Sequence, residues 1–162
     1  MKVKAQKITD FLDGKNAHFM IPAFQRPYEW IAKEQCKVLL DDLKDVSKKT
    51  RPHFFGTVVR VIDASSGDSI IIDGQQRLTT VSLLMLAIAH KIEDLEKIVD
   101  FKLPNKDEVL GLCIDYRKQQ KLKLKLSNKD MFSYSCIANR AFSSLVATAE
   151  FSKFAGIMSV AL

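Results

Sequence analysis

The segment Asp73–Arg77, which reads Asp-Gly-Gln-Gln-Arg, carries the side chains best suited to chemistry on a phosphate group. β-branched residues precede it, and apolar residues at helical spacing follow it, so we expect a strand that turns through a glycine into a helix. The first turn of a helix has free backbone N–H groups and a positive dipole end, which together bind anions. Gly74 lets the backbone approach a ligand, and the guanidinium of Arg77 can bind two phosphate oxygens. The segment therefore predicts a phosphate site.

Four polar side chains beside this turn are candidates for the same site. Gln75 and Gln76 could orient a phosphate or a water. Thr79 and Thr80 add hydroxyls, which could equally bond back to the first helical turn. An ordinary strand–glycine–helix turn is the alternative, with Asp73 acting only as a helix cap. The segment is not a Walker A motif, because the sequence contains no Gly-x-x-x-x-Gly-Lys followed by Ser or Thr.

A second group of candidate residues lies between Pro22 and Pro27. The two prolines exclude regular helix and predict an extended, conformationally fixed loop. This loop presents Gln25 and Arg26 beside aromatic residues, which suits base stacking and phosphate contact. The alternative is that the aromatic residues anchor the core and Arg26 pairs with a carboxylate.

A third candidate is Gly56, which interrupts the β-rich segment 53–58. A glycine inside a strand often marks close approach of a backbone or ligand, although a bulge or a packing adjustment explains it equally. Asp41 and Asp42 lie on an expected helix and could hold a metal or polarise a water, with a solvated helix face as the alternative. The histidines and cysteines show no zinc-binding constellation, and we predict no metal site formed by protein ligands.

The elements that must position these residues alternate between strand and helix patterns. Strands are expected at 18–21, 54–62, 69–73 and 121–126. Helices are expected at 33–49, from Gly74 to about Val99, at 107–119, and from Ser127 onward, where Ser127 and Asp130 resemble a capping box.

Two of these strands carry further expectations. The strands 54–62 and 69–73 should form an antiparallel hairpin. Ile70–Ile72 is apolar throughout, so we expect this strand to be covered on both faces. The alternating segment Lys121–Leu126 predicts a strand with one solvated, lysine-bearing face.

Composition limits the class of protein. The 162 residues are 47% hydrophobic and 27% charged, which is typical of a folded domain rather than a disordered chain. The sequence has no apolar run of membrane-spanning length and no pattern typical of a signal peptide, so we expect a cytoplasmic protein with no membrane partner. Its net charge of +6 favours a polyanionic partner such as a nucleotide or nucleic acid. The widely spaced cysteines are typical of reduced thiols, and Cys36 and Cys113 should be buried.

Together, the three candidate segments resemble the N-terminal domain of the GmrSD-type restriction endonucleases, which has a ParB/sulfiredoxin-like fold. The matching residues are Ile21-Pro22, Phe24–Tyr28, Trp30, Phe55-Gly56 and Ile72–Thr80, in the family's order. The resemblance implies an α+β fold with a small mixed β-sheet, packed helices and a helical C-terminal part. It further implies a ParB/sulfiredoxin-like nucleotide-binding core at 1–100 and a helical extension at 101–162 that contains the strand 121–126.

The resemblance also implies a function. Members of this family defend bacteria against phage by acting on modified DNA, and the Asp-Gly-Gln-Gln-Arg segment is associated with binding and hydrolysis of GTP, UTP or ATP. By position, the implied catalytic residues are Asp73, Gln75, Gln76 and Arg77. The implied nucleotide-binding residues are Gly74, Gln25, Arg26, Thr79, Thr80 and Gly56. Mg²⁺ is the expected helper ion, and DNA the expected macromolecular partner.

The expected activity is nucleoside triphosphate hydrolysis, with two alternatives left open: a non-catalytic ParB-like DNA-binding module and an interaction fragment. The sequence shows no His-Asn-His arrangement of the nuclease that usually follows this domain. We therefore expect a truncated front domain that does not cut DNA alone and that a nuclease domain or subunit complements. The apolar segment 141–162 is where a missing segment or a second copy of the chain would pack.

Overall fold

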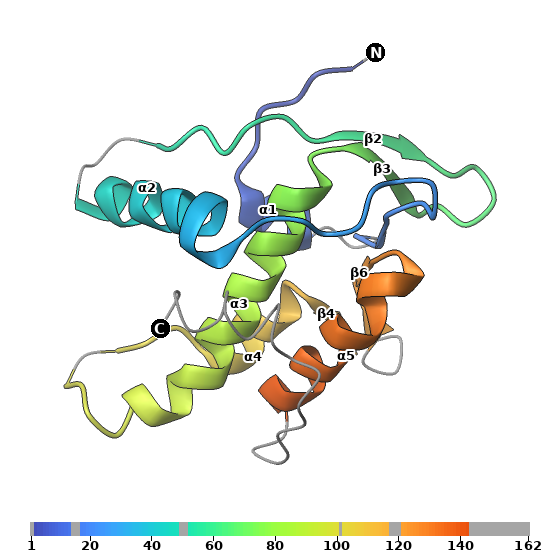
Figure 1. Ribbon diagram of the computed structural model, residues 1–162. Helices are drawn as coiled ribbons and strands as arrows, with labels where there is room; N and C mark the ends of the chain where they lie inside the picture. Colours follow the sequence, from blue (N-terminus) through green and yellow to red (C-terminus); the bar gives the residue numbers. More distant parts are fainter. Residues whose placement is uncertain (1, 14–16, 49–51, 101, 117–120, 143–162) are drawn as a thin grey trace.

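The computed structural model describes residues 2–13, 17–48, 52–100, 102–116 and 121–142 (Figure 1). Its helices are α1 (Ile8–Asp13), the π-helix η1 (Ala32–Cys36), α2 (Lys37–Lys48), α3 (Gln75–Leu95), α4 (Lys106–Gly111) and α5 (Asn128–Phe142). Its strands are β1 (Phe19–Met20), β2 (Val59–Ile62), β3 (Ser69–Asp73), β4 (Ile114–Asp115), β5 (Lys121–Leu122) and β6 (Leu124–Lys125). The expected α+β fold with a small mixed sheet is confirmed.

The larger sheet has the strand order β2-β3-β1-β6. β2 and β3 form the predicted antiparallel hairpin, whereas β1 pairs in parallel with β3 on one side and with β6 on the other. Phe19 lies opposite Ser69 and Leu124 in these two pairs. This sheet therefore joins strands from both sides of residue 100, the boundary that the sequence suggested between core and extension.

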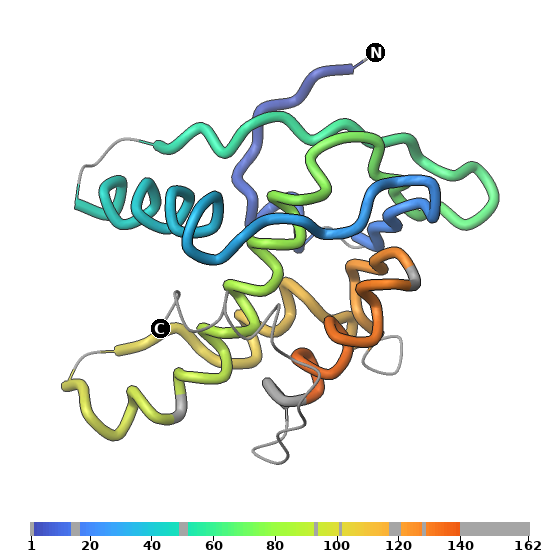
Figure 2. The backbone as a smooth tube through the Cα atoms, in the orientation of Figure 1, coloured from blue at the N-terminus to red at the C-terminus, as the bar shows by residue number. Residues whose placement is uncertain are grey.

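Helix α3 forms the centre of the hydrophobic core. Its residues Leu78, Leu83 and Leu86 are fully buried, and the helix packs against α4 and α5. Figure 2 traces α3 from the β3 hairpin through the middle of the molecule, with α5 along one side. Burial of a leucine side chain contributes about 1.5–3 kcal/mol, so these contacts hold the start of α3 in a fixed position.

Two strand predictions near the hairpin are partly wrong. The chain from 53 to 58 is not a strand, and β2 begins only at Val59. Gly56 has a φ of +104°, which a strand does not adopt, and the guanidinium of Arg77 binds the backbone on either side of it. Ile72 is 41% exposed, so β3 is not covered on both faces. Its neighbour β2 is exposed along its whole length and shields little of it.

The predicted lysine-bearing strand at 121–126 is also partly wrong, although Lys121 and Lys125 are exposed as predicted. The structure has two short strands there, which belong to different sheets and flank Lys123. The Lys123 backbone N–H donates to Cys113 O, and its carbonyl accepts from Phe19 N, so the chain crosses from one sheet to the other at this residue. The side chain of Lys123 is only 6% exposed, and its Nζ donates to Leu12 O at 3.0 Å.

Other boundaries differ in the second half of the chain. Helix α3 ends at Leu95 rather than near Val99. The helix predicted at 107–119 ends at Gly111, because Ile114 and the residue after it pair with β5. Residues 143–162, which hold most of the apolar segment predicted as a packing surface, lie outside the described residues. In the described part of the chain, no helix is long and apolar enough to cross a membrane.

Candidate phosphate site at the start of helix α3

Helix α3 begins in the way that the sequence predicts. Gly74 is its N-cap residue, with φ 90° and ψ 7°, and no side chain caps the first turn. A Cβ atom at Gly74 would lie 3.0 Å from Thr57 O and 3.2 Å from Val58 Cα, so the close backbone approach and the left-handed conformation both require glycine. The N-cap position is occupied by Gly74 and not by Asp73, so the alternative in which Asp73 caps the helix is wrong.

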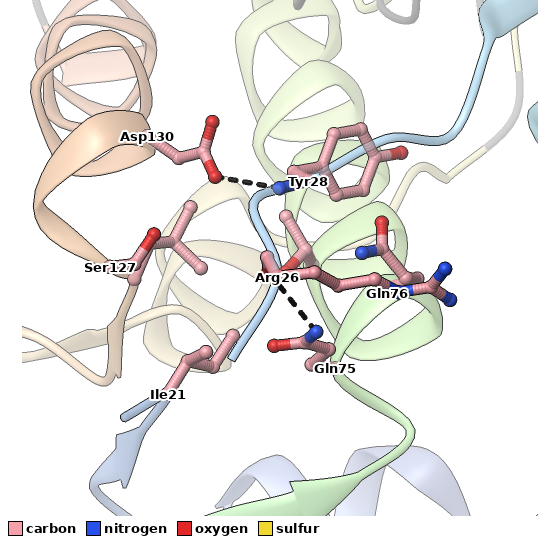
Figure 3. Close-up of a pocket in the computed structure, with 9 residues that line it drawn as sticks. Ile21, Arg26, Tyr28, Gln75, Gln76, Ser127 and Asp130 are labelled. Carbon is pink, nitrogen blue, oxygen red and sulfur yellow. Dashed lines mark hydrogen bonds between the residues drawn. The ribbon is translucent and has the colours of Figure 1, made fainter. Parts of the chain in front are cut away.

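Gln75 and Gln76 are both buried, and they hold the backbone of the loop 26–29. Gln75 Nε2 donates to Arg26 O at 3.2 Å, as Figure 3 shows. Gln76 Nε2 donates to Pro27 O at 3.0 Å, and its Oε1 accepts from Glu29 N at 2.9 Å. The two amides thus fix the loop that the prolines were predicted to stiffen.

Arg77 extends away from that loop, toward the segment 55–57. Its Nη2 donates to Thr57 O at 3.2 Å, and its Nη1 makes a longer contact of 3.5 Å with Phe55 O. A Cβ atom at Gly56 would lie 1.7 Å from Nη1, so glycine at this position makes room for the guanidinium. The close approach predicted at Gly56 is therefore an approach of Arg77, and the segment that makes it is not a strand.

Thr80 and Tyr28 form a buried polar pair behind the first turn of α3. Thr80 Oγ1 donates to Gln76 O at 2.8 Å, as the alternative for the threonines predicted. It also lies 2.8 Å from Tyr28 Oη, which in turn lies 3.3 Å from Cys36 Sγ. Burial, with a smaller contribution from the Cys36 contact, raises the pKa of Tyr28 far above its ordinary value. Tyr28 is thus a core anchor and stays a neutral phenol.

Arg26, by contrast, points its side chain into solvent. The side chain is 64% exposed, and its guanidinium forms an exposed ion pair with Glu29 at 3.3 Å, the carboxylate partner that the alternative interpretation predicted. Exposed pairs of this kind contribute about 0–1 kcal/mol, so an anionic ligand would displace Glu29 at little cost. Phe24, two residues earlier, is 81% exposed and is not a core residue.

A small cleft lies at the first turn of α3 (Figure 3). Its open volume is about 190 Å³, solvent at the mouth included. The residues that line it are Ile21, Arg26, Tyr28, Gln75, Gln76, Thr79, Leu126, Ser127 and Asp130.

Four of the predicted site residues therefore share this cleft: Arg26, Gln75, Gln76 and Thr79. The other predicted residues do not line it. Gln25 donates from Nε2 to Ile72 O at 2.9 Å, Asp73 is exposed, and Arg77 with Gly56 lies at the neighbouring segment 55–57.

Asp130 is the charged residue of the cleft that sequence analysis missed as a site residue. It lies in the first turn of α5, where its carboxylate Oδ2 accepts from Tyr28 N at 2.7 Å. The capping pattern of Ser127 and Asp130 correctly located the start of a helix, but it gave no sign of a partner 102 positions away.

Metal-binding potential is limited in the described segments. No group of three or more His, Cys, Asp or Glu side chains there could hold a metal ion. Asp41 instead accepts a hydrogen bond from Lys37 on the exposed face of α2, and this bond lowers the pKa of its carboxyl group. The solvated-face interpretation of Asp41 is therefore the correct one.

Residues 8–156 match the family described as "GmrSD restriction endonuclease, N-terminal domain". The chain belongs to this family. As a GmrSD N-terminal domain, it is a protein of a restriction system. No individual curated protein matches the chain.

Proposed function

We propose that this GmrSD N-terminal domain binds the phosphates of a nucleoside triphosphate in the cleft at the start of α3. One observation supports the proposal most: the first turn of α3 follows a left-handed glycine, carries no side-chain cap and borders the same cleft as Arg26. Free helix amides beside a guanidinium form a site that favours anions.

The size of the cleft limits which part of a nucleotide it would hold. Pockets for small molecules usually measure about 300–1,000 Å³. The open volume of about 190 Å³ includes solvent at the mouth, so the enclosed part of the cleft is much smaller than such a pocket and does not hold a whole nucleotide. We therefore expect the phosphates to bind at the mouth of the cleft, with the sugar and base outside it.

The two arginines have different roles in this proposal. Arg26 binds phosphate oxygens directly after it leaves Glu29. Arg77 lies outside the cleft, where its guanidinium contacts the neutral carbonyls of Phe55 and Thr57. To reach the triphosphate it would leave these carbonyls, which a phosphate can replace because it is the stronger acceptor. Hydrolysis of GTP, UTP or ATP would depend on positioning and charge stabilisation, with Asp73 and the segment Gln75–Arg77 as the proposed catalytic residues. Mg²⁺ typically binds with substrate phosphates and one or two carboxylates, so it would accompany the triphosphate into this site.

The first experiment is a thermal-shift screen against GTP, UTP, ATP and CTP, with and without Mg²⁺. A ligand that binds only the folded state must raise the melting temperature. If no nucleotide raises it at millimolar concentration, the proposal is wrong.

The second experiment measures the affinity of the best nucleotide by titration calorimetry for two arginine variants. Arg26→Ala and Arg77→Ala should each reduce affinity or turnover by ~10- to 1000-fold, the scale of losing one charge-stabilising donor. Lys97→Ala is the matched control, because it removes one exposed positive charge just beyond the other end of α3, about 30 Å away. Equal losses in all three variants would indicate general electrostatics rather than this site.

DNA is the second ligand class that the family description favours, since a restriction endonuclease acts on DNA and needs a nuclease domain or subunit. The net charge of +6 suits phosphate contacts along a duplex. In this alternative, DNA phosphates occupy the same cleft without turnover. A gel-shift series at rising salt separates the two proposals, because a binder that uses several phosphate contacts loses affinity steeply with salt. Absent DNA binding beside measurable nucleotide binding favours the nucleotide proposal.

A further inference from the structure

The backbone of the loop 26–29 is held by side chains from two helices. Gln75 and Gln76 on α3 bind Arg26 O, Pro27 O and Glu29 N. A further contact comes from Asp130 on α5, which accepts the N–H of Tyr28 (Figure 3). α5 therefore contributes a direct constraint on a loop that lies a hundred residues earlier in the chain.

The contact that Asp130 makes is stronger than the three amide contacts. Its acceptor is a carboxylate and its length is 2.7 Å, against 2.9–3.2 Å for the bonds of the two glutamines. Hydrogen bonds to an ionised group are shorter and roughly twice as strong as neutral ones. Asp130 is only 7% exposed, and a carboxylate is costly to bury without compensation. The first turn of α5 supplies part of that compensation through the helix dipole.

The segment held in this way is the one that carries the exposed cation of the cleft. Arg26 is separated from Tyr28 by Pro27 alone, and the proline ring fixes its own φ angle. The backbone from which the Arg26 side chain extends is thus fixed on one side by Gln75 and on the other by Asp130.

We propose that Asp130 is a positioning residue for the phosphate site: its carboxylate holds Tyr28 N and thereby sets the guanidinium of Arg26 at the mouth of the cleft. This inference rests on the proposed function, because it assigns a role in binding the same phosphates. It also makes α5 a necessary part of the site.

The test compares Asp130→Ala, Asp130→Asn and the matched control Asp42→Asn, which removes a carboxylate from the exposed face of α2. Titration calorimetry with inorganic triphosphate measures the affinity of each variant. Asp130→Ala removes the acceptor and should weaken binding by about tenfold, the lower end for a charged hydrogen bond. Asp130→Asn keeps an oxygen acceptor and should retain at least wild-type affinity. Asp42→Asn should bind as the wild type does.

Two further readouts separate positioning from general loss of structure. In a double-mutant cycle, Asp130→Ala should cost almost nothing once Arg26→Ala is present, because the two residues act through one contact. Hydrogen exchange at the Tyr28 amide should become faster in Asp130→Ala and stay slow in Asp130→Asn.

Opposite results would overturn the inference. If Asp130 only repels anions, both substitutions raise the affinity for triphosphate. If it only stabilises the fold, the losses from Asp130→Ala and Arg26→Ala add. If the wild-type chain binds no triphosphate at all, the proposed function fails and the role of Asp130 fails with it. If the wild type binds but Asp130→Ala leaves the affinity unchanged, only the role of Asp130 is refuted.

Discussion

Gly56→Ala is the substitution whose effect the structure defines most closely. The new Cβ atom would lie 1.7 Å from Arg77 Nη1 and 2.7 Å from its Cζ, so the guanidinium must move away. The φ of +104° at this position is also one that side chains with a Cβ rarely adopt. The substitution therefore imposes backbone strain and disrupts the contact between α3 and the segment 55–57.

The expected cost follows from these two effects. Backbone strain of this kind costs roughly 1–3 kcal/mol. The guanidinium is the far end of a flexible side chain, so its movement costs little beyond its two hydrogen bonds. Each bond is worth about 0.5–1.5 kcal/mol, and the 3.5 Å contact of Nη1 falls at the lower end. We expect a total destabilisation of about 2–4 kcal/mol, which in a chain of this size lowers the melting temperature by roughly 5–15 °C.

The assay is urea unfolding of four proteins: the wild type, Gly56→Ala, Arg77→Ala and the double variant. Gly67→Ala is the matched control, because Gly67 also has a positive φ, of 75°, but a Cβ there would meet nothing within 4 Å. It should cost only its backbone strain, about 1–2 kcal/mol. In the Arg77→Ala background, Gly56→Ala should likewise cost only strain, since the guanidinium is no longer there.

Two results would refute this explanation of the 55–57 segment. Equal destabilisation by Gly56→Ala in the presence and absence of Arg77 would mean that the side chain does not occupy the space above the glycine. An effect of Gly56→Ala no larger than that of Gly67→Ala would mean that the two carbonyl contacts contribute nothing measurable.

Three further predictions concern buried groups outside the cleft. Burial raises the pKa of Cys36 and raises that of Cys113 to about 12. Because the thiolate is the reactive form, a thiol reagent at pH 8 should label only Cys136 in the folded protein and all three cysteines in denaturant. Rapid labelling of all three thiols in the native protein would contradict this. The raised pKa of Cys113 also means that its contribution to stability is complete below about pH 9 and is lost as pH rises toward 12. The urea midpoint of the wild type should therefore fall over this pH range, and that of Cys113→Ala should fall less. Lys123→Ala should destabilise the fold by about 2 kcal/mol or more, because it removes a buried side chain and its hydrogen bond. Lys125→Ala, the control at an exposed position, should change the free energy of unfolding by no more than about 0.5 kcal/mol. Equal effects of the two substitutions would mean that Lys123 lies on the predicted solvated face.

Local sequence signals predicted the central turn of this protein. The apolar strand, Gly74 and the change to helical spacing are all within a few residues of each other, and the structure has a strand, a left-handed glycine and an uncapped helix in this order. Hydrophobic periodicity likewise predicted the long helix after Gly74, and the motif residues gave the family. These features depend on neighbours in the sequence, which is why the sequence sufficed.

Contacts between distant segments were not accessible in the same way. The alternation of Lys121–Leu126 predicts one strand, but pairing of its two halves with different sheets buries Lys123 between them. Nothing in the sequence around Arg77 indicates whether its guanidinium points toward Arg26 or toward Gly56, since both orientations are possible from the same position on the helix. The choice depends on which backbone carbonyls the packed core places within reach.

The sequence by itself determined where helix α3 begins, because a glycine and the change from strand to helical spacing are local features. Only the tertiary structure decided which side chains surround that point. It brought Asp130 to Tyr28 from 102 positions away and turned Arg77 aside. The physical reason is that side-chain hydrogen bonds are satisfied by whichever partners the packing of α3 against α4 and α5 brings within about 3 Å.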